Sequence, residues 1–229
     1  MDPRLTRRGL MAASAAAGAY VLLGCGDDDT PPPPKPSGTT SASTSTSADC
    51  TLTPEQTEGP YYVDNNLIRA DITDGKEGAP LDLRLTVLDA GSCEPIQNAT
   101  VEIWHCDAEG AYSGVQGESG DFLRGGQRSG RDGQVTFKTI YPGWYQGRAT
   151  HIHVKVHVSG QEVHTGQLYF DDSVNRSVYS RAPYDSRGEP DTTNANDGIY
   201  QQGGAESTVA VRRSGDGYTG RLSLGVQQA

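Results

Sequence analysis

The chain has 229 residues, a length that suits one domain of ordinary size with extensions. Only 34% of its residues are hydrophobic, while 29 Gly and 13 Pro make turns frequent, so long helices are not expected. The formal net charge of −10 argues against nucleic acid or an anionic membrane surface as the partner.

Residues 1–24 read as a cleaved export signal. The segment RLTRRGLMAASAAAGAYVLLGC has paired Arg7 and Arg8, then a core too short and too weakly apolar to span a membrane. The pair resembles a twin-arginine signal, whose route carries folded proteins, and LLGC resembles a bacterial lipobox that is lipidated at Cys25. A general secretory signal with a chance Arg pair is the alternative. We expect an exported lipoprotein of the cell envelope that touches the membrane only through its lipid.

Residues 25–49 predict a tether. Their composition is rich in Pro and then in Ser and Thr, which cannot bury a core. Because residues 1–24 hold three Arg and one Asp, their removal leaves 16 basic and 28 acidic residues, a formal net charge of −12. The folded domain is therefore expected over residues 50–229.

Three cysteines lie in this domain, namely Cys50, Cys93 and Cys106. An exported context permits a disulfide, and an odd number leaves one cysteine unpaired. The sequence alone does not choose the pair.

Short alternations of apolar and polar residues predict the strands of an all-β domain. The clearest has Leu81, Leu83, Leu85 and Val87 alternating with polar residues, the pattern of a half-buried strand. Further strands are expected over 100–105, 135–139, 151–158, 167–170, 208–211 and 221–224. The polar stretch 171–205 predicts loops and short helical turns. We expect a β-sandwich with long loops at one end.

The stretch YPGWYQGRATHIHVKVHV, residues 141–158, holds three of the five histidines. Residues two apart on a strand point to one face, so His151 and His153 project together, while Ile152 and Val154 belong to the opposite, apolar face. An HxH pair on a strand offers two imidazoles to one metal, although a polar strand with solvated histidines is the commoner reading.

Two tyrosines strengthen the metal interpretation. Tyr145 follows a Pro142-Gly143 turn that can bring its phenol back over the strand, and Tyr112 lies in the turn of WHCDAEGAYSG. Two phenols with two imidazoles favour a hard, highly charged ion such as ferric iron, because a free Tyr ionises only near pH ~10. Zinc more usually draws on Cys, His or carboxylate.

Four blocks in order, TEGPYYV, WHCDAEGAYSG, YPGWYQGRATHIHVKV and TGQLYFDD, resemble the intradiol ring-cleavage dioxygenases. The resemblance runs from about residue 53 to 200. It implies that non-haem Fe(III) is held by Tyr112, Tyr145, His151 and His153. One departure is that this chain reads RATHIH where the family often has PAHIH.

The same resemblance implies further roles. Tyr145 would take a proton from the substrate, and Arg148 would stabilise the negative charge that develops during the reaction. Gln167 would line the pocket. The substrate loop would comprise Thr57, Gly59, Pro60 and Tyr61.

The remaining histidines and Cys106 are not expected in the site. His105 is interpreted as structural, and His157 and His164 as solvated. Cys106 lies close to the Tyr112 turn, but a disulfide or a buried thiol is the more ordinary role than a ligand.

The resemblance implies cleavage of a catechol ring between its two hydroxyl-bearing carbons, with both atoms of O2 entering a muconate-type diacid. The partners would be a small catechol-type aromatic and O2. Two alternatives remain at this point: a non-catalytic β-sandwich that binds aromatics or a partner, and a zinc hydrolase built on the HxH pair. The ring substituents preferred and the oligomeric state stay open.

Overall fold

The computed structural model describes residues 50–115 and 117–228. The expected export signal over 1–24, the lipidation site Cys25 and the tether over 25–49 lie outside the described residues. Within the described ranges, no helix has the length and apolar character needed to cross a bilayer.

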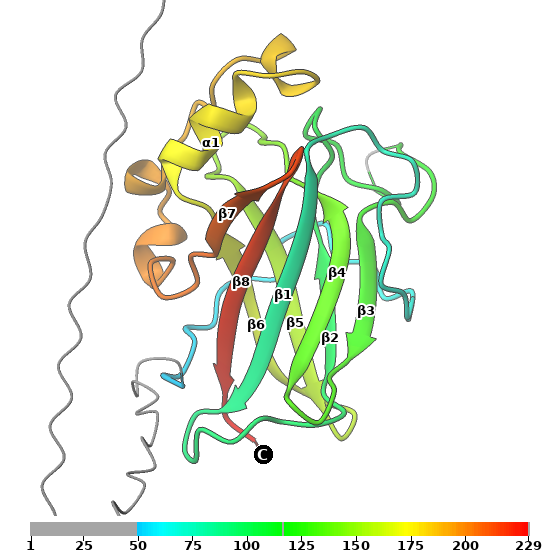
Figure 1. The fold of residues 1–229 in the computed structure, drawn as a ribbon, viewed down its shortest axis with the longest axis vertical. Helices are drawn as coiled ribbons and strands as arrows, with labels where there is room; N and C mark the ends of the chain where they lie inside the picture. Colours follow the sequence, from blue (N-terminus) through cyan, green and yellow to red (C-terminus); the bar gives the residue numbers. More distant parts are fainter. Residues whose placement is uncertain (1–49, 116, 229) are drawn as a thin grey trace, which may run out of the picture. The chain divides into compact units, whose positions relative to one another are not determined.

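The described chain forms two four-stranded sheets, which confirms the expected all-β class and agrees with a β-sandwich (Figure 1). Sheet A has the order β4-β1-β8-β7 and sheet B the order β3-β2-β5-β6. Pairing is antiparallel except between β1 and β8, which run parallel. The strands are β1 (Pro80–Asp89), β2 (Thr100–Trp104), β3 (Arg124–Arg128), β4 (Gln134–Ile140), β5 (His151–Val158), β6 (Gln161–Tyr169), β7 (Ala210–Ser214) and β8 (Gly217–Val226).

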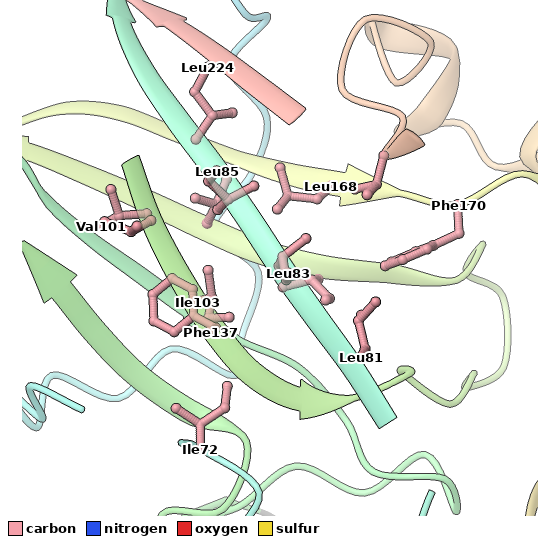
Figure 2. Close-up of a cluster of buried hydrophobic side chains, with 14 of the residues drawn as sticks. Ile72, Leu81, Leu83, Leu85, Val101, Ile103, Phe137, Leu168, Phe170 and Leu224 are labelled. Carbon is pink, nitrogen blue, oxygen red and sulfur yellow. The ribbon is translucent and has the colours of Figure 1, made fainter. Parts of the chain in front are cut away.

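The core lies between the two sheets. In β1, every second side chain points into it, as the alternation of apolar and polar residues predicts. Leu81, Leu83 and Leu85 point inward and are buried, while the polar residues between them face outward. Figure 2 shows these leucines in the same buried cluster as side chains from sheet B such as Ile103 and Leu168. Burial of these apolar side chains is the main force that joins the sheets.

Strand β3 was not expected from the sequence. Its residues, RGGQR, have no apolar alternation, and its two glycines serve a packing need instead. A Cβ on Gly125 would lie 2.7 Å from Ile72 Cγ2, and one on Gly126 would lie 3.4 Å from Ile68 Cδ1. The glycines thus make room for the segment 68–72, which forms a bridge to Gly126.

The stretch between β6 and β7 contains one α-helix and three 3-10 turns, as expected for the polar region 171–205 (Figure 1). Helix α1 (Asp172–Tyr179) begins at Asp171, whose side chain accepts a hydrogen bond from the Ser173 amide. The turns are η1 (Tyr184–Ser186), η2 (Asn194–Asn196) and η3 (Tyr200–Gln202).

The start of β5, an inner strand of sheet B, is buried on both faces, and this positions the candidate site. The first six residues of β5 are all buried, although only every second one faces the core. The outer face of β5 is covered by the N-terminal segment, where Gln56 donates its amide to the Thr165 carbonyl and Gly59 packs on His153. Polar side chains at the start of β5 are therefore enclosed rather than solvated.

Two questions about single residues are settled by the fold. Cys50 and Cys93 form a disulfide, which leaves Cys106 as a buried free thiol. The expectation that His164 is solvated is wrong, because its ring is buried and occupies the space next to Gly166, where a Cβ would lie 2.7 Å from its Nε2. His157 is half-buried and pairs with Glu102 at 3.3 Å, outside the site.

Candidate metal centre

The two histidines of the HxH pair lie side by side on the outer face of β5. Their Nε2 atoms are 3.1 Å apart, and both rings are buried. The Nδ1 of His151 is 2.6 Å from the Ala149 carbonyl oxygen, which directs its Nε2 toward His153. Trp104 stacks on His153 with ring centroids 4.9 Å apart and an interplanar angle of 4°, so this second ring is held flat against β2.

Tyr145 reaches the histidines from the loop between β4 and β5. Its hydroxyl oxygen lies 3.2 Å from His151 Nε2, as the Pro142-Gly143 turn led us to expect. The turn is tight because Gly143 packs on the Asp107 and Ala108 carbonyls, leaving no room for a side chain.

Tyr112 approaches from the loop that follows β2. Asp107 shapes this loop by accepting hydrogen bonds from the amides of Glu109 (3.0 Å) and Ala111 (2.9 Å). The Tyr112 ring lies 5.7 Å from that of Tyr145 and 6.0 Å from that of His153. Its hydroxyl is buried and has no hydrogen-bond partner among the described residues, a costly arrangement for a polar atom.

Burial sets the protonation of all four side chains. It lowers the pKa of His151 to about 3 and that of His153 well below its usual value, so both imidazoles are neutral and carry a free lone pair. It also raises the pKa of Tyr145 to about 12 and that of Tyr112 well above its usual value. Even with the Arg148 guanidinium lowering both pKa values, burial keeps both phenols protonated, so ionisation here would need a metal cation.

This donor set fits a ferric ion. Two imidazole nitrogens and the Tyr145 oxygen converge within hydrogen-bonding distance, and the buried Tyr112 hydroxyl lacks a partner. A hard trivalent cation would lower the pKa of both phenols and satisfy these atoms together. Across the described residues, no group of three or more His, Cys, Asp or Glu forms a metal-binding cluster. The candidate centre instead takes two of its four donors from tyrosine, Tyr112 and Tyr145.

Arg148 lies beside the four candidate ligands and is fixed by two neighbours. Its Nη1 is 3.4 Å from the Tyr145 hydroxyl oxygen, Nη2 donates to Gln167 Oε1, and Nε donates to Asp197 Oδ2 at 2.9 Å. Gln167 also accepts from the Tyr169 hydroxyl at 3.0 Å. The structure therefore brings Arg148 and Gln167 together with the four candidate ligands.

Asp197 is a site neighbour that sequence reasoning missed. Its carboxylate is buried and accepts from Arg148 and from the amides of Ala149 (2.7 Å), Ile199 (2.7 Å) and Tyr200 (3.1 Å). It therefore connects the Arg148 side chain to the backbone amide of Ala149, two residues before His151. Asp197 stands in a polar stretch without periodicity, so no local signal distinguishes it.

The expected substrate loop does cover this cluster. The Thr57 carbonyl accepts a hydrogen bond from Gln167 Nε2 at 2.9 Å. Gly59 has φ +73°, and a Cβ there would lie 3.2 Å from His153 Cε1. Pro60 follows and is exposed. Tyr61 stacks on Tyr112 with centroids 4.5 Å apart.

A cavity of about 270 Å³ lies next to this cluster on the outer face of sheet B. Its described lining includes Tyr62, Glu102, Trp104 and Arg124 but none of the four candidate ligands. Trp104 both lines the cavity and stacks on His153. The candidate ligands are thus enclosed by the loop over them rather than opening into this cavity.

The fold and this cluster define a dioxygenase-type β-sandwich, and comparison with known proteins agrees. A family model described as Dioxygenase matches residues 57–178. The chain belongs to the intradiol ring-cleavage dioxygenase family.

Similar solved structures share most of the domain. The intradiol ring-cleavage dioxygenase of Tetranychus urticae superimposes with a TM-score of 0.75 and 34% identity, covering 78% of this chain and 95% of that chain. The dioxygenase domain of a dioxygenase–carbohydrate-binding fusion from Streptomyces sp. SirexAA-E gives a TM-score of 0.60 and 32% identity, covering 78% of this chain and 99% of that one.

Among curated proteins, chlorocatechol 1,2-dioxygenase of Cupriavidus pinatubonensis is 32% identical over 139 residues, 50% of this chain and 53% of the relative. The chain thus spans about half the length of that relative. The curated relatives include proteins named as chlorocatechol and catechol 1,2-dioxygenases, the second kind from Acinetobacter lwoffii.

Proposed function

We propose that this protein is a non-haem iron(III) intradiol dioxygenase that cleaves catechol-type aromatics between the two hydroxyl-bearing carbons. Tyr112, Tyr145, His151 and His153 would hold the iron. The observation that carries the proposal is the position of His151 Nε2, which lies 3.1 Å from His153 Nε2 and 3.2 Å from the Tyr145 hydroxyl oxygen. Beside them is the buried Tyr112 hydroxyl, which lacks a hydrogen-bond partner among the described residues. The products would be muconate-type diacids.

Bound Fe(III) would supply the Lewis acid that holds a deprotonated catechol and makes its ring reactive toward O2. Because catechol would bind as a dianion, two protons must leave its hydroxyls. Tyr145, in its phenolate form, is the base placed to accept one of them, and the second would pass to solvent water. Both atoms of O2 enter the diacid, so the reaction needs no further reductant.

Arg148 would stabilise the negative charge that develops on the substrate oxygens. Its guanidinium points at the Tyr145 hydroxyl from 3.4 Å and is fixed by Asp197, so it would not need to reorganise during the reaction. The loop of Thr57, Gly59, Pro60 and Tyr61 would exclude water and contact the substrate ring. Gln167 would hold this loop through the Thr57 carbonyl.

The non-catalytic alternative explains the site less well. A module that only binds aromatics gains nothing from a buried phenol without a partner and two imidazoles aimed at each other. The zinc hydrolase alternative lacks a neighbouring carboxylate ligand, because the nearest buried one, Asp197, is committed to Arg148 and three backbone amides.

The test is to purify the protein, measure its iron content and record its visible spectrum. We expect a red protein, coloured by phenolate-to-iron charge transfer, whose spectrum shifts when catechol is added under nitrogen. Admission of O2 should then consume one O2 per catechol and yield a muconate-type diacid. A His153→Ala variant should lose both iron and colour. A colourless protein holding zinc, or no metal, would overturn the proposal.

We further propose that the protein is exported, by the twin-arginine route, and anchored at the cell envelope through Cys25. The support is the sequence of residues 1–25 alone. This route suits an iron enzyme, because a protein that crosses the membrane folded can acquire its metal beforehand.

A further inference from the structure

Lys155 is a buried cation that none of the roles above uses. It lies two residues after His153, on the same outer face of β5, and only 5% of it is exposed. Buried lysines are rare and are normally paired. Its ammonium group contacts Glu162 Oε2 at 3.0 Å, donates a hydrogen bond to Glu58 Oε2, and lies 4.2 Å from the centre of the Tyr62 ring.

Two of these three partners belong to the loop over the candidate metal centre. Glu58 and Tyr62 stand immediately before and after the tip of that loop, residues 59–61. The tip covers the site, because Gly59 packs on His153 and Tyr61 stacks on Tyr112. One ammonium group therefore contacts both flanks of the tip, while its third partner, Glu162, belongs to the rigid strand β6.

We propose that Lys155 is a positioning residue that holds the 58–62 loop closed over the candidate metal centre and thereby sets how tightly a catechol is bound. This inference rests on the proposed function. Lys155 itself touches neither the candidate ligands nor the space between them. It acts through Glu58 and Tyr62, so its effect falls on substrate binding rather than on the chemical step.

The charges around Lys155 explain why the loop depends on it. Without the ammonium group, Glu58 and Glu162 would face each other as like charges in a partly buried place. Glu58 is 41% exposed, so it would turn to water and draw the tip with it. The Thr57 carbonyl is held separately by Gln167, so the released segment begins at residue 58.

The test compares two carboxylates that share one lysine. Glu58→Gln replaces the ion pair on the loop with a weaker, uncharged acceptor, whereas Glu162→Gln does the same on β6 and leaves the ion pair of the loop in place, so it is the matched control. Lys155→Met removes both. Glu58 is the main target because its side chain is 41% exposed, so its replacement should leave the fold intact.

Limited chymotrypsin digestion reports the loop position without reference to iron or activity. Cleavage after Tyr61 requires the ring to leave Tyr112, so its rate follows the population of the open loop. We expect Glu58→Gln and Lys155→Met to increase that cleavage about tenfold, the loss that one hydrogen bond between charged groups represents. Glu162→Gln should match the wild type.

Kinetics supply the second readout. For catechol, we expect Glu58→Gln and Lys155→Met to raise KM about tenfold with kcat within about twofold and with iron content unchanged. Unchanged cleavage and unchanged KM in both variants would overturn the proposal, as would an equal effect of Glu162→Gln. If cleavage rises but even the wild type shows no ring cleavage, the loop contact stands and the proposed function fails.

Discussion

The hydroxyl of Tyr145 is the single atom on which the proposed proton transfer depends. Replacing it in Tyr145→Phe leaves Tyr112, His151 and His153 to hold iron, so part of the iron should be retained. Binding of catechol should slow about 100-fold or more, because the base that accepts its proton is gone. Stopped-flow absorbance under nitrogen measures this step.

Tyr218→Phe is the control for that variant, because Tyr218 packs on Tyr141 in the core, away from the metal centre. It should bind catechol at the wild-type rate. An unchanged binding rate in Tyr145→Phe itself would contradict the role of Tyr145 as the base.

Asp197 should matter through Arg148 rather than through the substrate. Asp197→Asn puts an amide where a carboxylate now accepts from Arg148 Nε and the Ala149 amide. We expect kcat to fall about 100-fold, the scale of effect that a small misplacement of a catalytic group produces. Steady-state kinetics with iron-matched samples measures it.

Asp191→Asn is the matched control for Asp197→Asn, because Asp191 is an exposed carboxylate that accepts only from the Gly147 amide and from Thr192. It should change kcat less than twofold, as surface substitutions usually do. If both variants lost activity equally, the effect would come from the loop as a whole and not from the contact with Arg148.

These residues also show where prediction from sequence ends at this scale. His151 and His153 were predictable, since strand periodicity is local and places them on one face. The position of Tyr145 against His151, six residues later, followed from the Pro142-Gly143 turn just before the tyrosine. Asp197 lies 49 residues from Arg148, and only the tertiary fold brings the two together.

At the scale of elements, strands with one buried face were predictable and strands shaped by neighbours were not. The alternation in β1 identified it correctly because one face packs on the core. Strand β3 was not predicted, because two of its positions are glycines that leave space for the side chains of Ile72 and Ile68 and so break the apolar alternation. His164 was misjudged for the same reason, since Gly166 leaves the space that buries its ring.

The disulfide between Cys50 and Cys93 ties the start of the domain to the turn after β1. Beyond it, Thr53 exchanges hydrogen bonds with Gly225 of β8, donating its amide at 2.8 Å and accepting at its hydroxyl at 3.0 Å. The segment held in this way leads directly into the 57–62 loop. Its anchorage therefore bears on both stability and the site.

Removal of this disulfide in a Cys50→Ser/Cys93→Ser variant should destabilise the domain. The bridge closes a loop of 43 residues, so its loss should lower the free energy of unfolding by about 2 to 4 kcal/mol. For a domain of this size that corresponds to a Tm roughly 10 °C lower. Differential scanning calorimetry measures the shift. A reductant should lower the wild-type Tm to that of the variant and leave the variant unchanged, and a reductant-insensitive wild type would argue against the bridge.

At the scale of the whole domain, the residues that stabilise the fold and those of the candidate site lie on opposite faces of sheet B. The space between the sheets holds the apolar core, and the outer face of sheet B holds the candidate metal centre under loops. A strand therefore carries His151 and His153, while separate loops would contact the substrate. Substrate preference is not readable from the sequence for this reason, because it depends on loop conformations that local patterns do not determine.

The proposed location of the molecule rests on Cys25, and a single substitution tests it. Expressed in a bacterial host, the wild-type protein should sediment with membranes and incorporate a labelled fatty acid. A Cys25→Ala variant should lose the label and fail to become membrane-bound, because one lipidated cysteine supplies the whole proposed attachment. Ser37→Ala, a change in the expected tether, is the matched control and should behave as the wild type. Fractionation followed by immunoblotting measures the distribution. If Cys25→Ala stayed with the membranes and the wild type took up no label, the proposed lipid attachment at Cys25 would be wrong.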